Sequence, residues 1–237
     1  MSDTTSFGPR FLAARWQNLI LANYPVPPEL LQRRLPPGLE LDHRDGQAWV
    51  SLVAFQFLDT RVLRVSWPGF RHFPEWNLRF YVRRGEQRGV CFIREFVPQR
   101  WVAWMARTLY REPYQSAPMT MQVTEDANTI QAEFTVTWNG RTHRLATMGA
   151  KPAMRPGPDS VEHFFKEHSW GFGWTRRGRL QSYRVNHAEW DVYPVRSFTA
   201  DLDWAALYGD DWQMMNGVEP ASVVLAVGSP VSVHFAK

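Results

Sequence analysis

The sequence predicts an α+β fold that is mostly antiparallel β-sheet, with a few short helices around it. Segments with strand-like patterns far outnumber the short helical segments, which is typical of such folds. The chain contains 12 Trp and 15 Phe, and large rings suit a wide β core because they fill roomy interiors. A length of 237 residues also suits a single barrel or sandwich.

The elements can be placed along the chain from its hydrophobic periodicity and turn residues. We expect a flexible tail at 1–10, followed by one domain at 11–237. Helices are expected just after Pro27, at 99–110, after a Ser160 cap and at 204–208. The main strands are expected at 15–24, 39–41, 49–58, 75–83, 90–97, 119–124, 129–138, after Gly140, and at 171–175, 180–187, 190–198, 222–227 and 231–235.

The segment 75–83 alternates between apolar and polar side chains. One face carries Trp76, Leu78, Phe80 and Val82, and the other carries Glu75, Asn77, Arg79 and Tyr81. Antiparallel sheets often expose one face to water, so the polar stripe can face solvent. It can equally face a barrel interior, where inward polar groups bind a ligand. The strand alone leaves both interpretations open.

The charge and cysteine content narrow the classes of function. The formal net charge is +4, but the arginines are scattered and form no basic arm, which argues against nucleic-acid binding. Cys91 is the only cysteine, so an intrachain disulfide is excluded and a reducing compartment is indicated. We find no apolar leader and no apolar run of membrane-spanning length. The expected location is the cytoplasm.

Common catalytic and cofactor motifs are missing from the sequence. His163 and His168 are five positions apart, whereas a helical zinc pair needs four, so we interpret them as surface residues. The sequence has no phosphate loop and no Gly-x-Ser-x-Gly elbow. Cys91 lies among apolar residues, which predicts a buried, inert thiol. We therefore expect neither a metal nor a cofactor.

Five segments resemble the YqjF-like uncharacterised bacterial family. They are Arg15–Leu19, Tyr24–Leu31, Leu35–Asp42, Gly46–Val53 and Phe73–Val82. That family resembles a branch of the acetoacetate-decarboxylase-like superfamily, which implies a cone-like β-barrel with flanking helices and an internal pocket. In the decarboxylase an arginine and a glutamate orient the substrate, and the matching residues here are Arg15 and Glu75.

The resemblance breaks at the residue that forms the Schiff base. The decarboxylase carries adjacent lysines after its central helix, but the matching stretch, Arg111–Ser116, contains none. Arginine cannot replace lysine there, because guanidinium stays protonated. Of the three lysines, we expect Lys166 and Lys237 to be solvated and Lys151 to lie in a loop with its ammonium group in water.

Three functions are considered. The favoured one is binding of a small carboxylate or carbonyl compound in the barrel without Schiff-base chemistry, using Arg15, Asn77, Arg79 and Trp104. The second is an enzyme of lyase or hydrolase type that uses Glu75 and Tyr114 as acid and base. The third is an arginine-rich binder of nucleic acid or other anions. A membrane partner is not expected, and self-association into a homo-oligomer is left open.

Overall fold

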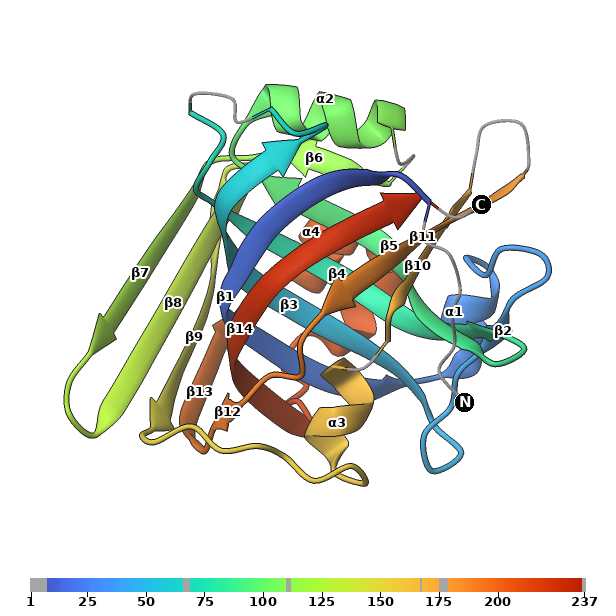
Figure 1. Cartoon of the computed structure of the whole chain (residues 1–237). Helices are drawn as coiled ribbons and strands as arrows, with labels where there is room; N and C mark the ends of the chain where they lie inside the picture. The colour runs from blue at the N-terminus through green and yellow to red at the C-terminus, as the bar shows by residue number, and fades with distance from the viewer. Residues whose placement is uncertain (1–7, 66–68, 110–111, 167, 175–178, 236–237) are drawn as a thin grey trace.

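The chain forms a closed β-barrel with a smaller sheet packed on one side (Figure 1). The computed structural model describes residues 8–65, 69–109, 112–166, 168–174 and 179–235. Strand β5 pairs with β4 and closes the ring, and the barrel pairs are antiparallel except β10 with β5. In order of pairing, the barrel strands are β4 (Phe73–Arg84), β3 (Ala48–Val62), β1 (Arg10–Val26), β14 (Ser222–Phe235), β11 (Leu180–His187), β10 (Trp170–Trp174) and β5 (Gln87–Val97).

The smaller sheet covers the outer face of β4. Its strands are β13 (Val195–Asp201), β9 (Arg141–Ala150), β8 (Thr129–Trp138) and β7 (Met119–Glu125). Alternate residues of β8, including Ile130 and Phe134, are buried in the main core with Trp76, Leu78 and Phe80. These three residues therefore point out of the barrel and are covered by the smaller sheet.

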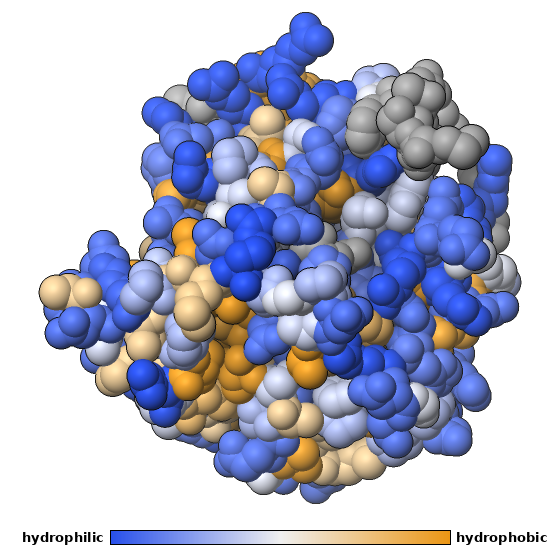
Figure 2. Space-filling view, turned by 60° about the horizontal axis from the view of Figure 1, so that its bottom comes forward, coloured by the Kyte–Doolittle hydropathy of each residue, from blue (hydrophilic) through white to orange (hydrophobic). Residues whose placement is uncertain are grey.

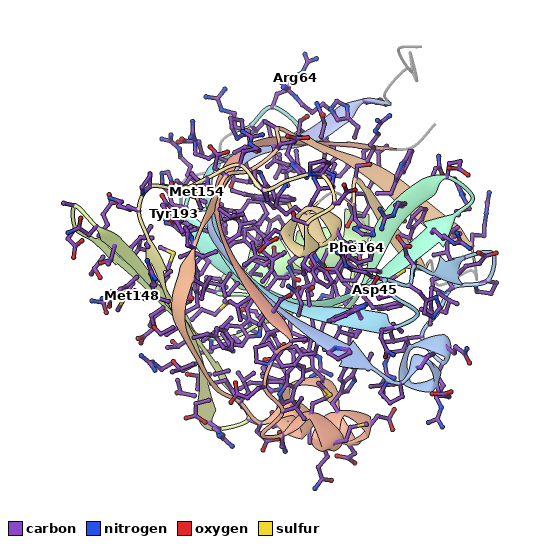
Figure 3. All side chains as sticks on the ribbon, turned by 90° about the horizontal axis from the view of Figure 1, so that it is seen from below. Asp45, Arg64, Met148, Met154, Phe164 and Tyr193 are labelled. Atoms are coloured by element: carbon purple, nitrogen blue, oxygen red, sulfur yellow. The ribbon has the colours of Figure 1, made fainter. Side chains whose placement is uncertain are left out.

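The short helices close the ends and one side of the structure. Helix α2 (Arg100–Leu109) lies over one end of the barrel and α3 (Val161–Lys166) over the other (Figure 1). Figure 3 shows α3 with Phe164 across the lower end. Helix α4 (Trp204–Tyr208) packs against β4, where the Trp76 indole donates to the Tyr208 hydroxyl at 2.8 Å. The remaining elements are α1 (Pro28–Gln32), η1 (Asp210–Met215), β2 (Glu40–Leu41), β6 (Tyr114–Ser116) and β12 (Val192–Tyr193).

A bulge in β1 changes which residues face the barrel interior. Before the bulge Trp16 faces inward, and after it Leu19 and Leu21 do so. The register with β3 shifts between Gln17 and Ile20, and Asn18 has a φ of 54°. A bulge inserts one extra residue, so the inward positions change from even to odd numbers.

Two predicted strand boundaries are wrong. The last two strands are one continuous strand, β14, because Gly228 at a φ of 89° bends the chain without ending the pairing with β1. The single strand expected at 190–198 is two, β12 and β13. Pro194 separates them, because proline has no N–H to donate to a ladder.

The face seen in Figure 2 is mostly hydrophilic, and its hydrophobic residues gather mainly left of centre. The apolar side chains instead form two main buried clusters. One lies between the barrel and the smaller sheet, and the other lies inside the barrel with residues of α2 and α3. The inner cluster surrounds the candidate site.

The close approach at Gly228 predicts a large cost for substitution. A Cβ atom there would lie 2.1 Å from the Trp16 carbonyl oxygen. We expect Gly228→Ala to lower the free energy of unfolding by roughly 3 kcal/mol or more, because steric overlap adds to left-handed strain. Gly217→Ala is the matched control, since its φ is 77° with nothing within 4 Å of a Cβ. It should cost about 1 kcal/mol. If urea unfolding shows the same loss of free energy of unfolding for both variants, the close approach at Gly228 is contradicted.

Candidate active site

The barrel interior contains a cavity of about 100 Å³ that all seven barrel strands line. Apolar side chains, such as Phe55, Phe57 and Phe92, form most of its wall. The polar side chains that line it are Glu75, Asn77, Arg79, Glu95, Glu112, Tyr114, Lys166, His168, Tyr183 and His187. A cavity needs about 10–15 Å³ to hold one water molecule. This cavity is several times larger, so it suits a small organic molecule.

Glu75 is the centre of a hydrogen-bonded cluster. The Tyr114 hydroxyl donates to Glu75 Oε2 at 2.7 Å, and Asn77 Nδ2 donates to Glu75 Oε1 at 3.0 Å. Glu95 also hydrogen-bonds to the Glu75 carboxyl group. Two carboxyl groups can form this bond only when one of them holds a proton, and the bond raises the pKa of Glu95 while it lowers that of Glu75, which favours the proton on Glu95.

The carboxyl groups of this cluster ionise with difficulty. Burial raises the pKa of Glu75 to about 7, against the opposing effects of Tyr114, Asn77 and Arg79. Burial also raises the pKa of Glu112 to about 8, although Tyr183 hydrogen-bonds to it. The pKa of Glu95 is raised still more clearly, first by burial and then by the nearby Glu75 and Glu112 charges. A carboxyl group with a pKa near neutrality can both give and take a proton in its working range.

Cationic and neutral donors lie on another part of the wall. Arg79 Nη2 donates to the Phe165 carbonyl at 3.0 Å, next to the buried Lys166 at the end of α3. His168 Nε2 lies 2.9 Å from Asp42 Oδ2. Burial lowers the pKa of His168, which favours a neutral ring that donates to Asp42 through Nε2.

Several buried polar atoms of the cavity wall have no hydrogen-bond partner within the described part of the protein. They are Trp16 Nε1, Asn77 Oδ1, Arg79 Nε, Glu95 Oε1, Glu112 Oε1 and His168 Nδ1. Buried polar groups are nearly always hydrogen-bonded, and each exception needs an explanation. A ligand that offers both donors and acceptors would satisfy these atoms.

The structure brings together some of the predicted site residues and not others. Glu75, Asn77, Arg79 and Tyr114 line the cavity, which places the polar stripe of β4 inside the barrel. Arg15 is exposed and lies outside the cavity, because it precedes the β1 bulge and alternates with the inward-facing Trp16.

Trp104 is also outside the cavity. Its side chain is 49% exposed on the outer face of α2, where it stacks on Trp101 with ring centroids 4.5 Å apart. The helical periodicity places Met105 and Ala106 toward the barrel instead, and both are covered more than Trp104.

Two expectations about basic side chains are wrong. Lys166 was expected in solvent, but it is 2% exposed and lines the cavity, because α3 turns its last residue inward beside Phe165. His168 was expected on the surface, but it follows α3 into the barrel wall and is buried. Lys151 does lie at the surface, where its Nζ is 2.8 Å from Glu125 Oε2.

Sequence reasoning missed Glu95 and Glu112. Strict alternation along β5 places Glu95 on the outer face with Cys91, which is buried in the outer core. A register shift opposite Leu78 and Arg79 leaves Ile93 unpaired and turns Glu95 inward. Glu112 lies outside any strand, so no periodicity marks it. A signal for Glu95 was the pair of charged residues, Arg94 and Glu95, within the otherwise apolar segment 90–97 of β5.

Two further features bear on the class of site. Within the described part of the chain, no group of His, Cys, Asp or Glu side chains is arranged to hold a metal ion. None of the described helices combines the length and apolar character needed to span a membrane.

Comparison with known proteins places the fold. The model of the family DUF2071, described as an uncharacterized conserved protein, matches residues 13–231. The uncharacterized protein YqjF of Bacillus subtilis (strain 168) is 38% identical over 114 residues, which are 47% of this chain and 47% of that protein. The match therefore spans about half the length of this curated relative. These matches confirm the resemblance to YqjF.

Solved structures share the barrel at low sequence identity. The enduracididine biosynthesis enzyme MppR superposes with a TM-score of 0.64 at 14% identity, covering 99% of this chain and 89% of that chain. Acetoacetate decarboxylase from Legionella pneumophila gives 0.60 at 15%, covering 97% and 85%. An acetoacetate-decarboxylase-like enzyme from Sphingomonas wittichii RW1 gives 0.61 at 16%, covering 95% and 90%. The expected acetoacetate-decarboxylase-like fold is confirmed.

The raised pKa of Glu112 predicts how stability depends on pH. A carboxyl group whose pKa is raised in the folded state contributes its full share of folding stability at pH values below its unfolded pKa. That contribution is lost as the pH rises through the folded pKa. For Glu112 this window runs from its ordinary value of 4.5 to about 8. Glu112→Gln keeps an acceptor for Tyr183, so it should stabilise the protein by roughly 1–3 kcal/mol at pH 8.5 and hardly at pH 5.

Urea unfolding at the two pH values measures this difference. Glu189→Gln is a control, because Glu189 is an exposed partner of Arg155. An equal effect of Glu112→Gln at both pH values would show that Glu112 ionises normally in the folded protein.

Proposed function

The chain belongs to the DUF2071 family, and for this member we propose that the barrel cavity binds a small organic compound with a carboxylate or carbonyl group, without Schiff-base decarboxylation. The unpartnered polar atoms of the cavity wall carry this proposal. A cavity with mostly apolar walls and a few converging polar groups is the usual form of a small-molecule site.

Arg79 is the residue that would hold the oxygen atoms of the ligand. Its Nη2 is already bonded to Phe165, while its buried Nε–H has no partner. A carboxylate or carbonyl oxygen would accept from this Nε–H, and the charge would strengthen the bond. MppR, which shares the fold, has been solved in complex with pyruvate, a compound of this class.

The binding test uses pyruvate and longer 2-oxo acids as probes, with titration calorimetry as the measurement. Arg79→Gln should weaken binding by about tenfold or more, because a hydrogen bond to a charged group contributes roughly 1.5–3 kcal/mol. Arg83→Gln is the matched control, since Arg83 is exposed on the same strand and pairs with Glu40. The proposal is wrong if none of these acids binds, or if the Arg79→Gln variant binds them as tightly as the wild type does.

Absence of Schiff-base chemistry is tested separately, because Lys166 lines the cavity. The proposal assigns Lys166 to charge balance beside the ligand, so borohydride in the presence of pyruvate should leave no adduct on it. Mass spectrometry after reduction gives the answer. An adduct that maps to Lys166 and disappears in Lys166→Met would overturn this part of the proposal.

A second candidate function is proton transfer by Glu75 and Tyr114. The 2.7 Å hydrogen bond between them and the Glu75 pKa of about 7 favour it. Glu75 carboxylate would take a proton from the carbon beside the ligand carbonyl. The C–H electron pair would form a carbon–carbon double bond while the π pair of the carbonyl moves onto its oxygen, and Arg79 would stabilise the resulting enolate.

Deuterium exchange into the probe tests the second candidate. In D₂O, the wild type should exchange the protons on C3 of 2-oxobutyrate, with a rate that rises with pH through about 7 as Glu75 ionises. Glu75→Gln should slow the exchange by about a hundredfold or more, and Tyr114→Phe by a smaller factor. If the wild type binds the acid but exchanges no faster than buffer, the protein is a binder only.

A further inference from the structure

A second, smaller chamber lies between the barrel and α2. Its volume is about 60 Å³. Val102, Met105 and Ala106 of α2 form one side of it. The rest of its lining is Leu12, Phe57, Thr60, Val62, Phe70, Phe73, Glu75 and Tyr114.

The chamber shares a wall with the main cavity. Leu12, Phe57, Glu75 and Tyr114 line both spaces. The hydrogen-bonded Glu75–Tyr114 pair therefore faces the chamber on one side and the main cavity on the other. Leu12 and Phe57 are apolar, and a change of their rotamers would join the two spaces without breaking a hydrogen bond.

The lining of the chamber is chemically different from that of the cavity. Apart from the shared Glu75 and Tyr114, Thr60 is the one polar residue among the described residues that line it. Thr60 is buried, and its hydroxyl has no protein partner. Among the residues that the structure describes, no lysine, arginine or histidine lines the chamber, and none of them can neutralise a charged group there. An apolar group is what such a space accepts at least cost.

We propose that this chamber binds the apolar substituent of the ligand whose carboxylate or carbonyl end lies in the main cavity. The ligand class is then an oxo acid or related carbonyl compound with an unbranched hydrocarbon chain of several carbons. This inference rests on the proposed function. The reacting carbon would lie beside the Glu75–Tyr114 pair, because that pair stands where the two spaces meet.

A chain-length series tests the inference. The probes are the unbranched 2-oxo acids from pyruvate to 2-oxooctanoate. Each added methylene that enters the chamber should tighten binding about threefold to fourfold, until the chamber is full and the affinity stops rising. Ala106→Leu reduces the free space of the chamber, so the affinity of this variant should stop rising one or two carbons earlier in the series. Its affinity for pyruvate, which is too short to enter the chamber, should match that of the wild type.

Two more variants keep the test decisive. Val102→Phe narrows the same chamber and replaces Ala106→Leu if that variant does not fold. Trp104→Ala changes an exposed residue of the same helix and should leave the series unchanged. If pyruvate binds but the wild-type series is flat, or if neither chamber variant shortens it, the inference is wrong while the proposed function stands. If no acid of the series binds, the proposed function itself fails.

Discussion

Strand β4 is buried on both faces, and the rest of the structure depends on that constraint. Its outer face packs Trp76, Leu78 and Phe80 against the smaller sheet and α4. Its inner face carries Glu75, Asn77 and Arg79 into the cavity, where the Glu75 and Asn77 side chains are buried. Ionisable groups buried in this way must bond to one another or stay uncharged, because an isolated buried charge is very costly. The barrel therefore holds a cluster of polar side chains that hydrogen-bond to one another.

The carboxyl groups of that cluster oppose one another's ionisation. Glu75, Glu95 and Glu112 are all buried, and each ionised carboxylate makes the next more difficult to form. Tyr114 and Asn77 donate to Glu75, so the negative charge that does form is held there. Arg79 provides the compensating positive charge on the same strand. The result is a carboxyl group with a raised pKa, on the same strand as the Arg79 guanidinium and at the wall of an apolar chamber.

Much of this arrangement could be predicted from the sequence. The alternation at 75–83 separates the two faces of β4, and the resemblance to the YqjF-like family indicates that the polar face is internal. Placement of Arg15 and Glu95 could not be predicted, because each depends on a bulge that reverses alternation within its strand. Lys166 and His168 were missed because α3 is only six residues long, too short for a reliable amphipathic pattern. Burial there depends on how the helix meets the barrel end.

The central claim is that Glu75 holds its proton until near neutral pH. The most direct test is a pH titration of the glutamate side-chain carboxyl carbons by ¹³C NMR, with the Glu75 resonance assigned by its loss in Glu75→Gln. Our account predicts that this resonance titrates with a midpoint pH of about 7. A midpoint near the ordinary glutamate value of 4.5 would mean that Glu75 is solvated and ionised, and would contradict the account.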